Sequence, residues 1–213
     1  MGIIRIKGVL SSWKGRVLRA SAVPWQDHWT ARAAMVSFNL KWIGANSLIL
    51  VGDSILEMVP QQALEGLNIV NAGFGGATAA NVYASINSPV VLSALKANPP
   101  LKAIIQAGTN DSTTRADPGA VSGQVMSICS LFLDMGTVPV VFAIPPIEEK
   151  KTAFRSAAAA DAINIATRAA SLKNAVTYID PYASLRGLED VTEDGIHLSR
   201  KAIVALVEAI RAA

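Results

Sequence analysis

The stretch ILVGDSI, residues 49–55, is the part of the sequence that decides the fold. Its apolar residues are typical of a buried strand, and Gly52-Asp53 marks a tight turn at the strand's end. A helical spacing of apolar residues follows directly over residues 56–59. A strand that runs straight into a helix places Ser54 at the carboxyl edge of a sheet, beside backbone N–H groups. Ser54 is therefore either a helix cap or a nucleophile, and this motif alone favours a cap or an ordinary turn.

Short apolar runs alternate with helical patterns along the rest of the chain. The runs are rich in Ile, Val and Leu and lack polar alternation, which indicates parallel strands covered on both faces. Right-handed crossovers between such strands produce a doubly wound, three-layer α/β/α sandwich, here with a five-stranded parallel sheet. The expected strands are residues 47–51, 67–71, 101–107, 138–143 and 175–179, and the expected helices are residues 27–42, 55–65, 77–97 with a break at Pro89, 118–135, 152–173 and 199–212.

The first 45 residues differ in charge from the rest of the chain. They contain seven Lys or Arg and a single acid, Asp27, which gives a charge of +6, whereas residues 46–213 carry −3. We therefore divide the chain into a basic N-terminal arm with a lead-in helix, residues 1–45, and a folded domain, residues 46–213. The helix is expected to begin at Asp27 and to end at Gly44. The arm, residues 1–24, is either solvated against the domain or a contact for a membrane surface or a protein partner.

Composition excludes several classes of protein. With 51% hydrophobic and 16% charged residues, the chain can bury a large core, so disorder is not expected. No apolar run reaches the roughly 18 to 20 residues of a membrane span, and no secretory signal is evident, which favours a cytoplasmic location. The domain has no basic patch with a nucleic-acid-binding motif, so we expect no nucleic-acid partner. One cysteine, Cys129, and two histidines offer no disulfide framework and no transition-metal cluster, and we expect no metal or cofactor.

Two further loops at the carboxyl ends of predicted strands carry polar or glycine-rich segments. NAGFGGAT, residues 71–78, can bring backbone N–H groups close to a ligand. It fails the dinucleotide-binding fingerprint, because Thr78 replaces the third glycine and residues 79–110 contain no acid. QAGTND, residues 106–111, is either an ordinary turn or a loop that points the Asn110 amide into the same cleft.

The last loop, EDGIHL at residues 193–198, precedes the final helix. It contains one of the two histidines, His197, three positions after Asp194. Asp194 can orient the imidazole and stabilise its protonated form, as the third member of a catalytic triad does. The other histidine, His28, lies in the lead-in helix, where partial exposure or a structural hydrogen bond is a sufficient explanation.

Taken together, the four blocks Gly52-Asp53-Ser54, residues 71–76, residues 108–111 and Asp194-x-x-His197 resemble the SGNH, or GDSL-type, hydrolase family. The resemblance covers about residues 47–212. It implies a flavodoxin-like sandwich and a serine esterase that hydrolyses small or short-chain acyl esters, carbohydrate O-acetyl groups among them, through an acyl-enzyme. The alternatives that stay open are a thioesterase or lysophospholipase of the same family and a non-catalytic binding module on the same fold.

The resemblance also implies roles for individual residues. Ser54 becomes the nucleophile, His197 the general base and Asp194 its orienting carboxylate. The oxyanion hole is formed by the backbone N–H groups of Ser54 and Gly76 and by the side chain of Asn110. A serine hydroxyl needs such a base to attack at neutral pH. Asp53 is expected to be a hydrogen-bonding residue of the turn, and Ala77 replaces a residue that is often polar in the family, which leaves open how this loop is braced. Candidate walls of the substrate pocket are Phe74, Tyr83, Ile144 and Pro145, with Pro146 and Tyr182 as further candidates.

Overall fold

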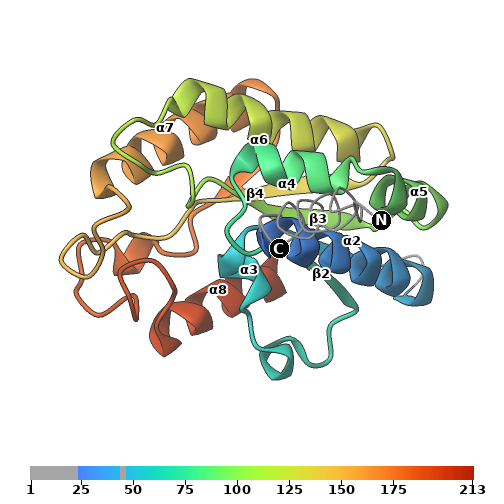
Figure 1. Ribbon diagram of the computed structural model, residues 1–213, viewed down its shortest axis with the longest axis horizontal. Helices are drawn as coiled ribbons and strands as arrows, with labels where there is room; N and C mark the ends of the chain where they lie inside the picture. The colour runs from blue at the N-terminus through green and yellow to red at the C-terminus, as the bar shows by residue number, and fades with distance from the viewer. Residues whose placement is uncertain (1–23, 44–46) are drawn as a thin grey trace, which may run out of the picture.

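The computed structural model describes residues 24–43 and 47–213, with a parallel sheet at the centre (Figure 1). The chain enters the sheet at β1, turns to β2 on one side, and then crosses back to β3 on the other. This reversal between β1 and β3 is the position at which doubly wound folds bind their ligands. The strands are β1 (Leu48–Gly52), β2 (Ile69–Gly73), β3 (Lys102–Gln106), β4 (Val138–Phe142) and β5 (Thr177–Ile179), in the order β2-β1-β3-β4-β5.

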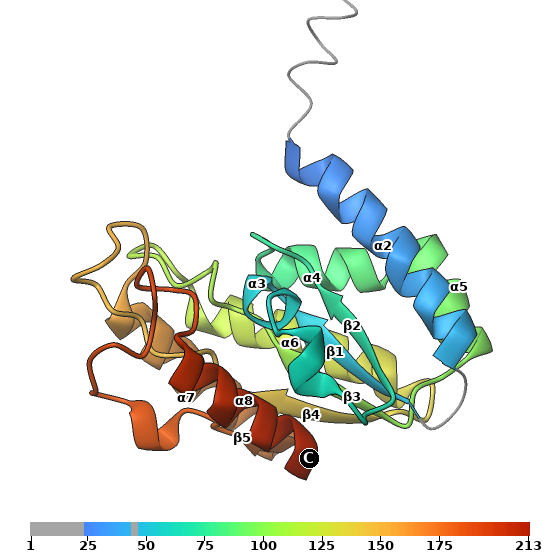
Figure 2. The same ribbon diagram turned by 90° about the horizontal axis from the view of Figure 1, so that it is seen from below.

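Helices cover both faces of the sheet, as the two views show (Figures 1 and 2). Alternate strand residues point to opposite sides, so Ile49 and Val51 of β1 join one core cluster while Leu50 joins the other. The first cluster packs under α2 (Pro24–Ile43), α4 (Ala79–Ile86), α5 (Pro89–Ala97), α6 (Pro118–Leu133) and α7 (Ala157–Lys173), and the second packs under α3 (Ser54–Glu57), η1 (Gln61–Leu64) and α8 (Arg200–Ala212). A further short helix, η2 (Ala183–Leu185), follows β5.

The observed architecture confirms the predicted fold class. All five strands begin and end within two residues of the predicted runs. Pro89 begins α5 at its first position, where a proline costs no hydrogen bond, and this separates α4 from α5 as expected. Cys129 is buried in α6.

Three predicted helix boundaries are wrong, each for a local reason. The helix expected over residues 55–65 is interrupted, because Pro60 has no N–H and restricts the residue before it; only α3 and the 3₁₀ helix η1 form. α7 begins at residue 157 instead of 152, where the Ser156 side chain accepts a hydrogen bond from the Ala159 N–H at 3.3 Å. α2 begins at Pro24, so Asp27 lies in its first turn and is not its cap.

The lead-in helix α2 packs directly on the sheet. Ala33, Val36 and Leu40 are buried in the same cluster as residues of β1 and β2. The predicted basic arm, apart from Pro24, and the predicted helix end at Gly44 lie outside the described residues. None of the helices within residues 24–43 and 47–213 is both long and apolar enough to cross a membrane.

Candidate active site

Ser54 is the first residue of α3 and is separated from β1 by Asp53 alone. The turn is tight because β1 closely approaches β3: a Cβ at Gly52 would lie 2.1 Å from the Gln106 carbonyl oxygen. Asp53 is fully buried, and its Oδ1 accepts a hydrogen bond from the Ile55 N–H at 3.0 Å, which caps α3. Burial raises the pKa of Asp53 to about 6, although the bond from Ile55 lowers it in part. Asp53 therefore holds the turn from inside the protein.

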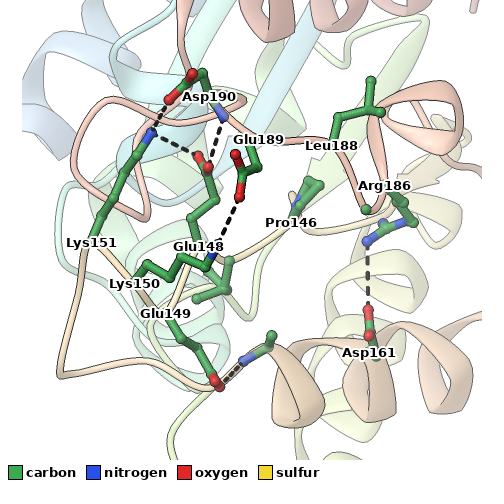
Figure 3. A pocket seen from close by; sticks show the side chains of 13 residues that line it. Pro146, Glu148, Glu149, Lys150, Lys151, Asp161, Arg186, Leu188, Glu189 and Asp190 are labelled. Atoms are coloured by element: carbon green, nitrogen blue, oxygen red, sulfur yellow. Dashed lines mark hydrogen bonds and ion pairs between the residues drawn. The ribbon is translucent and has the colours of Figure 1, made fainter.

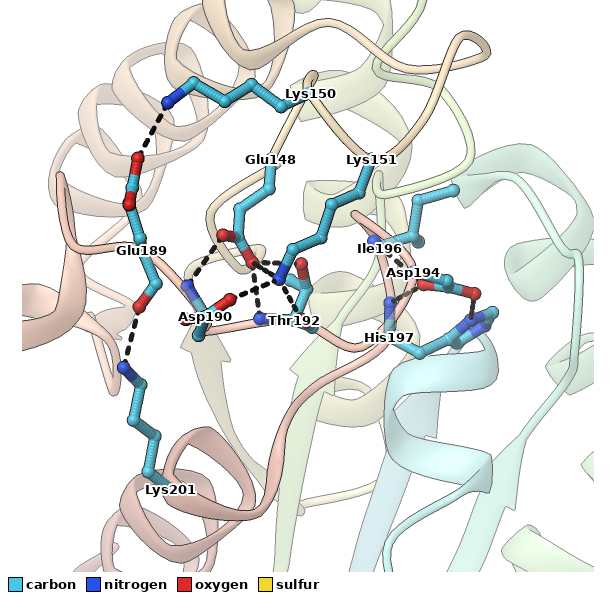
Figure 4. A network of polar contacts seen from close by, with 10 residues as sticks. All are labelled: Glu148, Lys150, Lys151, Glu189, Asp190, Thr192, Asp194, Ile196, His197 and Lys201. Carbon is cyan, nitrogen blue, oxygen red and sulfur yellow. Dashed lines mark hydrogen bonds and ion pairs between the residues drawn. The ribbon is translucent and has the colours of Figure 1, made fainter.

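The structure brings Ser54, His197 and Asp194 together from opposite ends of the chain. The Nε2 atom of His197 lies 3.0 Å from Ser54 Oγ, and its Nδ1 atom lies 2.7 Å from Asp194 Oδ2. The other carboxylate oxygen of Asp194 accepts hydrogen bonds from the backbone N–H groups of His197 at 2.8 Å and Ile196 at 3.0 Å (Figure 4). A single carboxylate thus holds both the imidazole ring and the backbone that carries it.

Hydrogen bonds keep the Asp194 carboxylate ionised, and this decides the tautomer of a neutral His197 ring. Partial burial raises the pKa of Asp194, but the hydrogen bonds from the His197 backbone, the His197 ring and the Ile196 backbone outweigh it and hold that pKa at about 2. An ionised carboxylate can only accept, so Nδ1 of the neutral imidazole carries the proton and Nε2 presents its lone pair to the Ser54 hydroxyl. This is the geometry of a nucleophile, a base and an orienting carboxylate.

The two predicted oxyanion donors other than Ser54 lie on the loops after β2 and β3, the strands that flank β1. Gly76 is exposed and has a φ of 73°, a conformation that favours glycine. Within residues 24–43 and 47–213, neither the Gly76 N–H nor the Ser54 N–H has a hydrogen-bond acceptor. The Asn110 side chain donates to the Ala77 carbonyl at 3.0 Å and accepts from Arg155 Nη2 at 2.7 Å. A guanidinium only donates and a carbonyl only accepts, so the amide orientation is determined and one Nδ2 hydrogen is left for a ligand.

A second set of contacts ties the β2 loop to the β3 loop. Asp111 accepts a hydrogen bond from the Ala79 N–H at the start of α4 at 2.9 Å. Thr78 and Asn81 form a capping box at the same helix start. The segment that carries Gly76 is therefore fixed at its carboxyl end by α4 and by the loop that carries Asn110.

The loop that carries Asp194 and His197 is held by Glu148, a residue that the sequence analysis missed (Figure 4). The Glu148 carboxylate accepts hydrogen bonds from the Asp190 N–H at 2.8 Å, from the Thr192 N–H at 2.7 Å and from the Thr192 hydroxyl. Lys151 Nζ lies 3.2 Å from the same carboxylate. Partial burial raises the pKa of Glu148, but these hydrogen bonds outweigh it and lower the pKa to about 2. No motif marks Glu148, because its partners on this loop, Asp190 and Thr192, lie more than 40 positions away.

We expect Glu148→Gln to destabilise the protein by about 1–2 kcal/mol at neutral pH, because the charged acceptor of several hydrogen bonds is lost. The folded-state pKa is lowered, so the contribution of Glu148 is complete above its ordinary pKa of 4.5 and disappears as the pH falls towards 2. Chemical denaturation at pH 7 and pH 3 measures the effect. Glu193→Gln, an exposed change in the same loop, is the control. A stability difference that is the same at both pH values would contradict this account of Glu148.

The cavity beside Glu148 is lined mainly by charged residues (Figure 3). It has a volume of about 730 Å³, and its cations are paired: Lys150 with Glu189 at 2.7 Å, and Arg186 with Asp161 at 3.7 Å. Three further cavities lie within the described part of the chain. None of the four is lined by Ser54, Asp194 or His197. The site around Ser54 is instead open: the His197 side chain is 31% exposed and that of Asp194 is 55% exposed.

The candidate pocket walls do not gather at this open site. Phe74, Ile144 and Pro145 are buried in the interior, so their side chains belong to the packing of the fold and present no surface to a substrate. Tyr182 is also buried and accepts a hydrogen bond from Gln106 at 2.9 Å. Of the remaining candidates, Tyr83 lines a separate groove against α6, and Pro146 lines the charged cavity beside Glu148.

Comparison with known proteins gives a family match and several related folds. The sequence profile of the GDSL-like lipase/acylhydrolase family matches residues 50–202. No curated protein sequence matches the chain significantly.

Among solved structures, a GDSL-like lipase from Bacteroides thetaiotaomicron has a TM-score of 0.68 and 16% identity, over 89% of this chain and 96% of its own. A lipase/acylhydrolase from Enterococcus faecalis has a TM-score of 0.59 and 18% identity, over 78% of this chain and 96% of its own. A carbohydrate acetylesterase from Sinorhizobium meliloti has a TM-score of 0.61 and 18% identity, over the same shares of 78% and 96%. At these identities, the likeness concerns the fold.

Proposed function

Because the chain belongs to the GDSL-like lipase/acylhydrolase family, we propose that it is a serine esterase that hydrolyses small or short-chain acyl esters through an acyl-enzyme. The observation that carries the proposal is the continuous hydrogen-bonded line from Ser54 Oγ through His197 to Asp194, with distances of 3.0 Å and 2.7 Å. A serine hydroxyl becomes a nucleophile when a base at this distance accepts its proton.

In the proposed reaction, Ser54 Oγ attacks the ester carbonyl carbon as its proton passes to His197 Nε2. Asp194 stabilises the resulting imidazolium. The tetrahedral intermediate collapses when the carbon–oxygen bond to the alcohol breaks and His197 returns the proton to the departing oxygen. The acyl group then remains on Ser54. A water molecule then attacks the acyl-enzyme as its proton passes to His197. The bond between the acyl carbon and Ser54 Oγ breaks, and His197 gives the proton to Ser54, which releases the acid and restores the free serine.

The negative oxygen of the tetrahedral intermediate would face the N–H groups of Ser54 and Gly76 and the Asn110 amide. Removal of one such donor costs about 10²–10³-fold in turnover. Arg155 strengthens the third donor, because its guanidinium, 2.7 Å from Asn110 Oδ1, draws electron density from the amide and makes its N–H more positive. No local sequence pattern marks Arg155, because it lies 45 positions from Asn110.

The exposure of His197 and Asp194 supports a short acyl group on an alcohol that extends into solvent. The similarity in fold to a carbohydrate acetylesterase supports carbohydrate O-acetyl groups as the first substrates to test. Both points concern the substrate class and are independent of the proposed roles of Ser54 and His197.

A substrate screen tests the proposal. It compares p-nitrophenyl esters of increasing chain length, acetylated sugars, acyl-CoA thioesters and lysophospholipids with one preparation of the protein. We expect acetyl and other short acyl esters to be hydrolysed fastest, and a fluorophosphonate probe to label the chain. Preference for thioesters or for long-chain lysophospholipids would overturn the substrate class, while the absence of both hydrolysis and labelling would favour a binding module.

A further inference from the structure

The peptide between Gly75 and Gly76 is held by a side chain of α2. Trp29 Nε1 donates a hydrogen bond to the Gly75 carbonyl at 2.9 Å. The Gly75 carbonyl and the Gly76 N–H belong to one planar trans peptide, in which the two groups point in opposite directions. The bond from Trp29 therefore sets the direction of the Gly76 N–H, the second proposed oxyanion donor. It also polarises that N–H, as a hydrogen bond to the carbonyl of an amide does.

Glu57, the last residue of α3, holds the preceding peptide. Its carboxylate accepts a hydrogen bond from the Gly75 N–H and lies 3.0 Å from His28 Nε2 and 3.4 Å from Arg32 Nε. The Glu57 and Arg32 side chains are only 19% and 17% exposed, so solvent screens this group little. Both backbone groups of Gly75 are thus hydrogen-bonded: its N–H donates to Glu57, and its carbonyl accepts from Trp29.

Arg32 fixes the point at which β2 ends and the loop begins. Its guanidinium donates to the carbonyls of Gly73 and Asn71, each at 3.0 Å. The loop also lies too close to α3 for larger residues: a Cβ at Gly73 would lie 2.3 Å from the Glu57 backbone nitrogen, and one at Gly75 would lie 2.7 Å from Glu57 Oε2. The glycines of this loop therefore serve its contact with Glu57 as well as the exposure of its N–H groups.

We propose that Trp29 and Arg32, from α2, and Glu57, from α3, are positioning residues for the oxyanion hole. This inference rests on the proposed esterase function. It explains how the loop is braced although Ala77 supplies no polar side chain. It also assigns a role to a helix that lies outside the segment matched by the family profile, residues 50–202. The positioning acts on the transition state, in which the oxyanion is present, and leaves substrate binding and the Ser54–His197 pair unchanged.

The test compares Trp29→Phe with Trp42→Phe in the full-length chain, with p-nitrophenyl acetate as substrate. Phenylalanine keeps an aromatic ring at position 29 but removes the N–H donor. Trp42 is on the same helix and 75% exposed, so the same change there is a matched control. We expect kcat to fall about tenfold for Trp29→Phe with KM within about twofold of wild type, and no change for Trp42→Phe. Hydrogen exchange of the peptide spanning residues 73–78 should be faster only in Trp29→Phe.

Two further variants separate positioning from loss of stability. Glu57→Gln keeps the size of the side chain and removes its charge, and it carries the test if Trp29→Phe does not fold. Val36→Ala should lower Tm because it removes two buried methyl groups from α2, and it leaves Trp29, Arg32 and Glu57 unchanged. A fall in kcat in Glu57→Gln but not in Val36→Ala at similar Tm supports positioning. A fall that follows Tm in all of these variants overturns it.

Failure of the inference is distinguishable from failure of the esterase proposal. If Ser54→Ala is inactive while Trp29→Phe and Glu57→Gln keep wild-type kcat, the positioning role is overturned and the esterase proposal stands. If Ser54→Ala keeps wild-type activity, both are overturned.

Discussion

Ser54→Ala is expected to lower kcat/KM for p-nitrophenyl acetate by at least about 10⁴-fold. The change removes the oxygen that lies 3.0 Å from His197 Nε2 and leaves the base with nothing to deprotonate except water. The loss falls on kcat, because the hydroxyl contributes to the reaction and little to the binding of a small ester. Tm should change little, since the hydroxyl bonds to a half-buried imidazole and the turn is held by Asp53.

The measurement combines steady-state kinetics with fluorophosphonate labelling and identification of the labelled peptide. Ser130→Ala, an exposed change in α6, controls for substitution of a serine as such. Labelling on the peptide that contains Ser54, and its disappearance in Ser54→Ala, is the expected result. Activity within about tenfold of wild type in Ser54→Ala would remove Ser54 from the mechanism.

Asp194→Asn should lower kcat by about 10³-fold. An asparagine oxygen can still accept the hydrogen bonds from the Ile196 and His197 backbone, so the loop keeps its shape. The amide nitrogen then faces His197 Nδ1, to which it can only donate. The imidazole would adopt the tautomer with its proton on Nε2, and the lone pair that Ser54 needs would be lost. The exposure of Asp194 lets solvent compensate in part, which is why we do not expect the full loss seen at a buried carboxylate.

Asp190→Asn is the matched control for this variant. Asp190 lies in the same loop and has a φ of 57°, a conformation that asparagine also tolerates. Its side chain is 86% exposed and pairs with Lys151 at 3.0 Å, away from His197. We expect activity within about twofold of wild type for Asp190→Asn. Equal activities for the two variants, measured over a range of pH with Tm as a check on folding, would show that Asp194 does not orient the base.

The strands and the blocks that end them could be predicted because their signals are local. A run such as residues 48–52 is apolar on both faces because both faces of a parallel sheet are covered. The turn at Asp53 likewise depends on a neighbour two residues away. The helix predicted over residues 55–65 failed at Pro60, a local signal that outweighs the apolar spacing around it.

The supports of the site could not be predicted in this way. Glu148, Arg155 and Trp29 contact loops that lie roughly 40 or more positions away, and their local surroundings are those of ordinary polar or aromatic residues on a loop or helix. The candidate pocket walls failed for the same reason: an aromatic or apolar residue near a strand end, such as Phe74, has the same local pattern whether it faces a ligand or the core.

The sequence by itself thus determined the positions of the strands, the family and the residues proposed for chemistry. Apolar strand runs and turns could be predicted because each depends on a few neighbouring positions. Only the tertiary structure decided the distances among Ser54, His197 and Asp194, the openness of the site and the identity of the residues that hold its loops. Those depend on side chains that meet across the sandwich, and the free energy of such contacts depends on geometry that no local pattern encodes. The most consequential of them places α2 against the Gly75–Gly76 peptide.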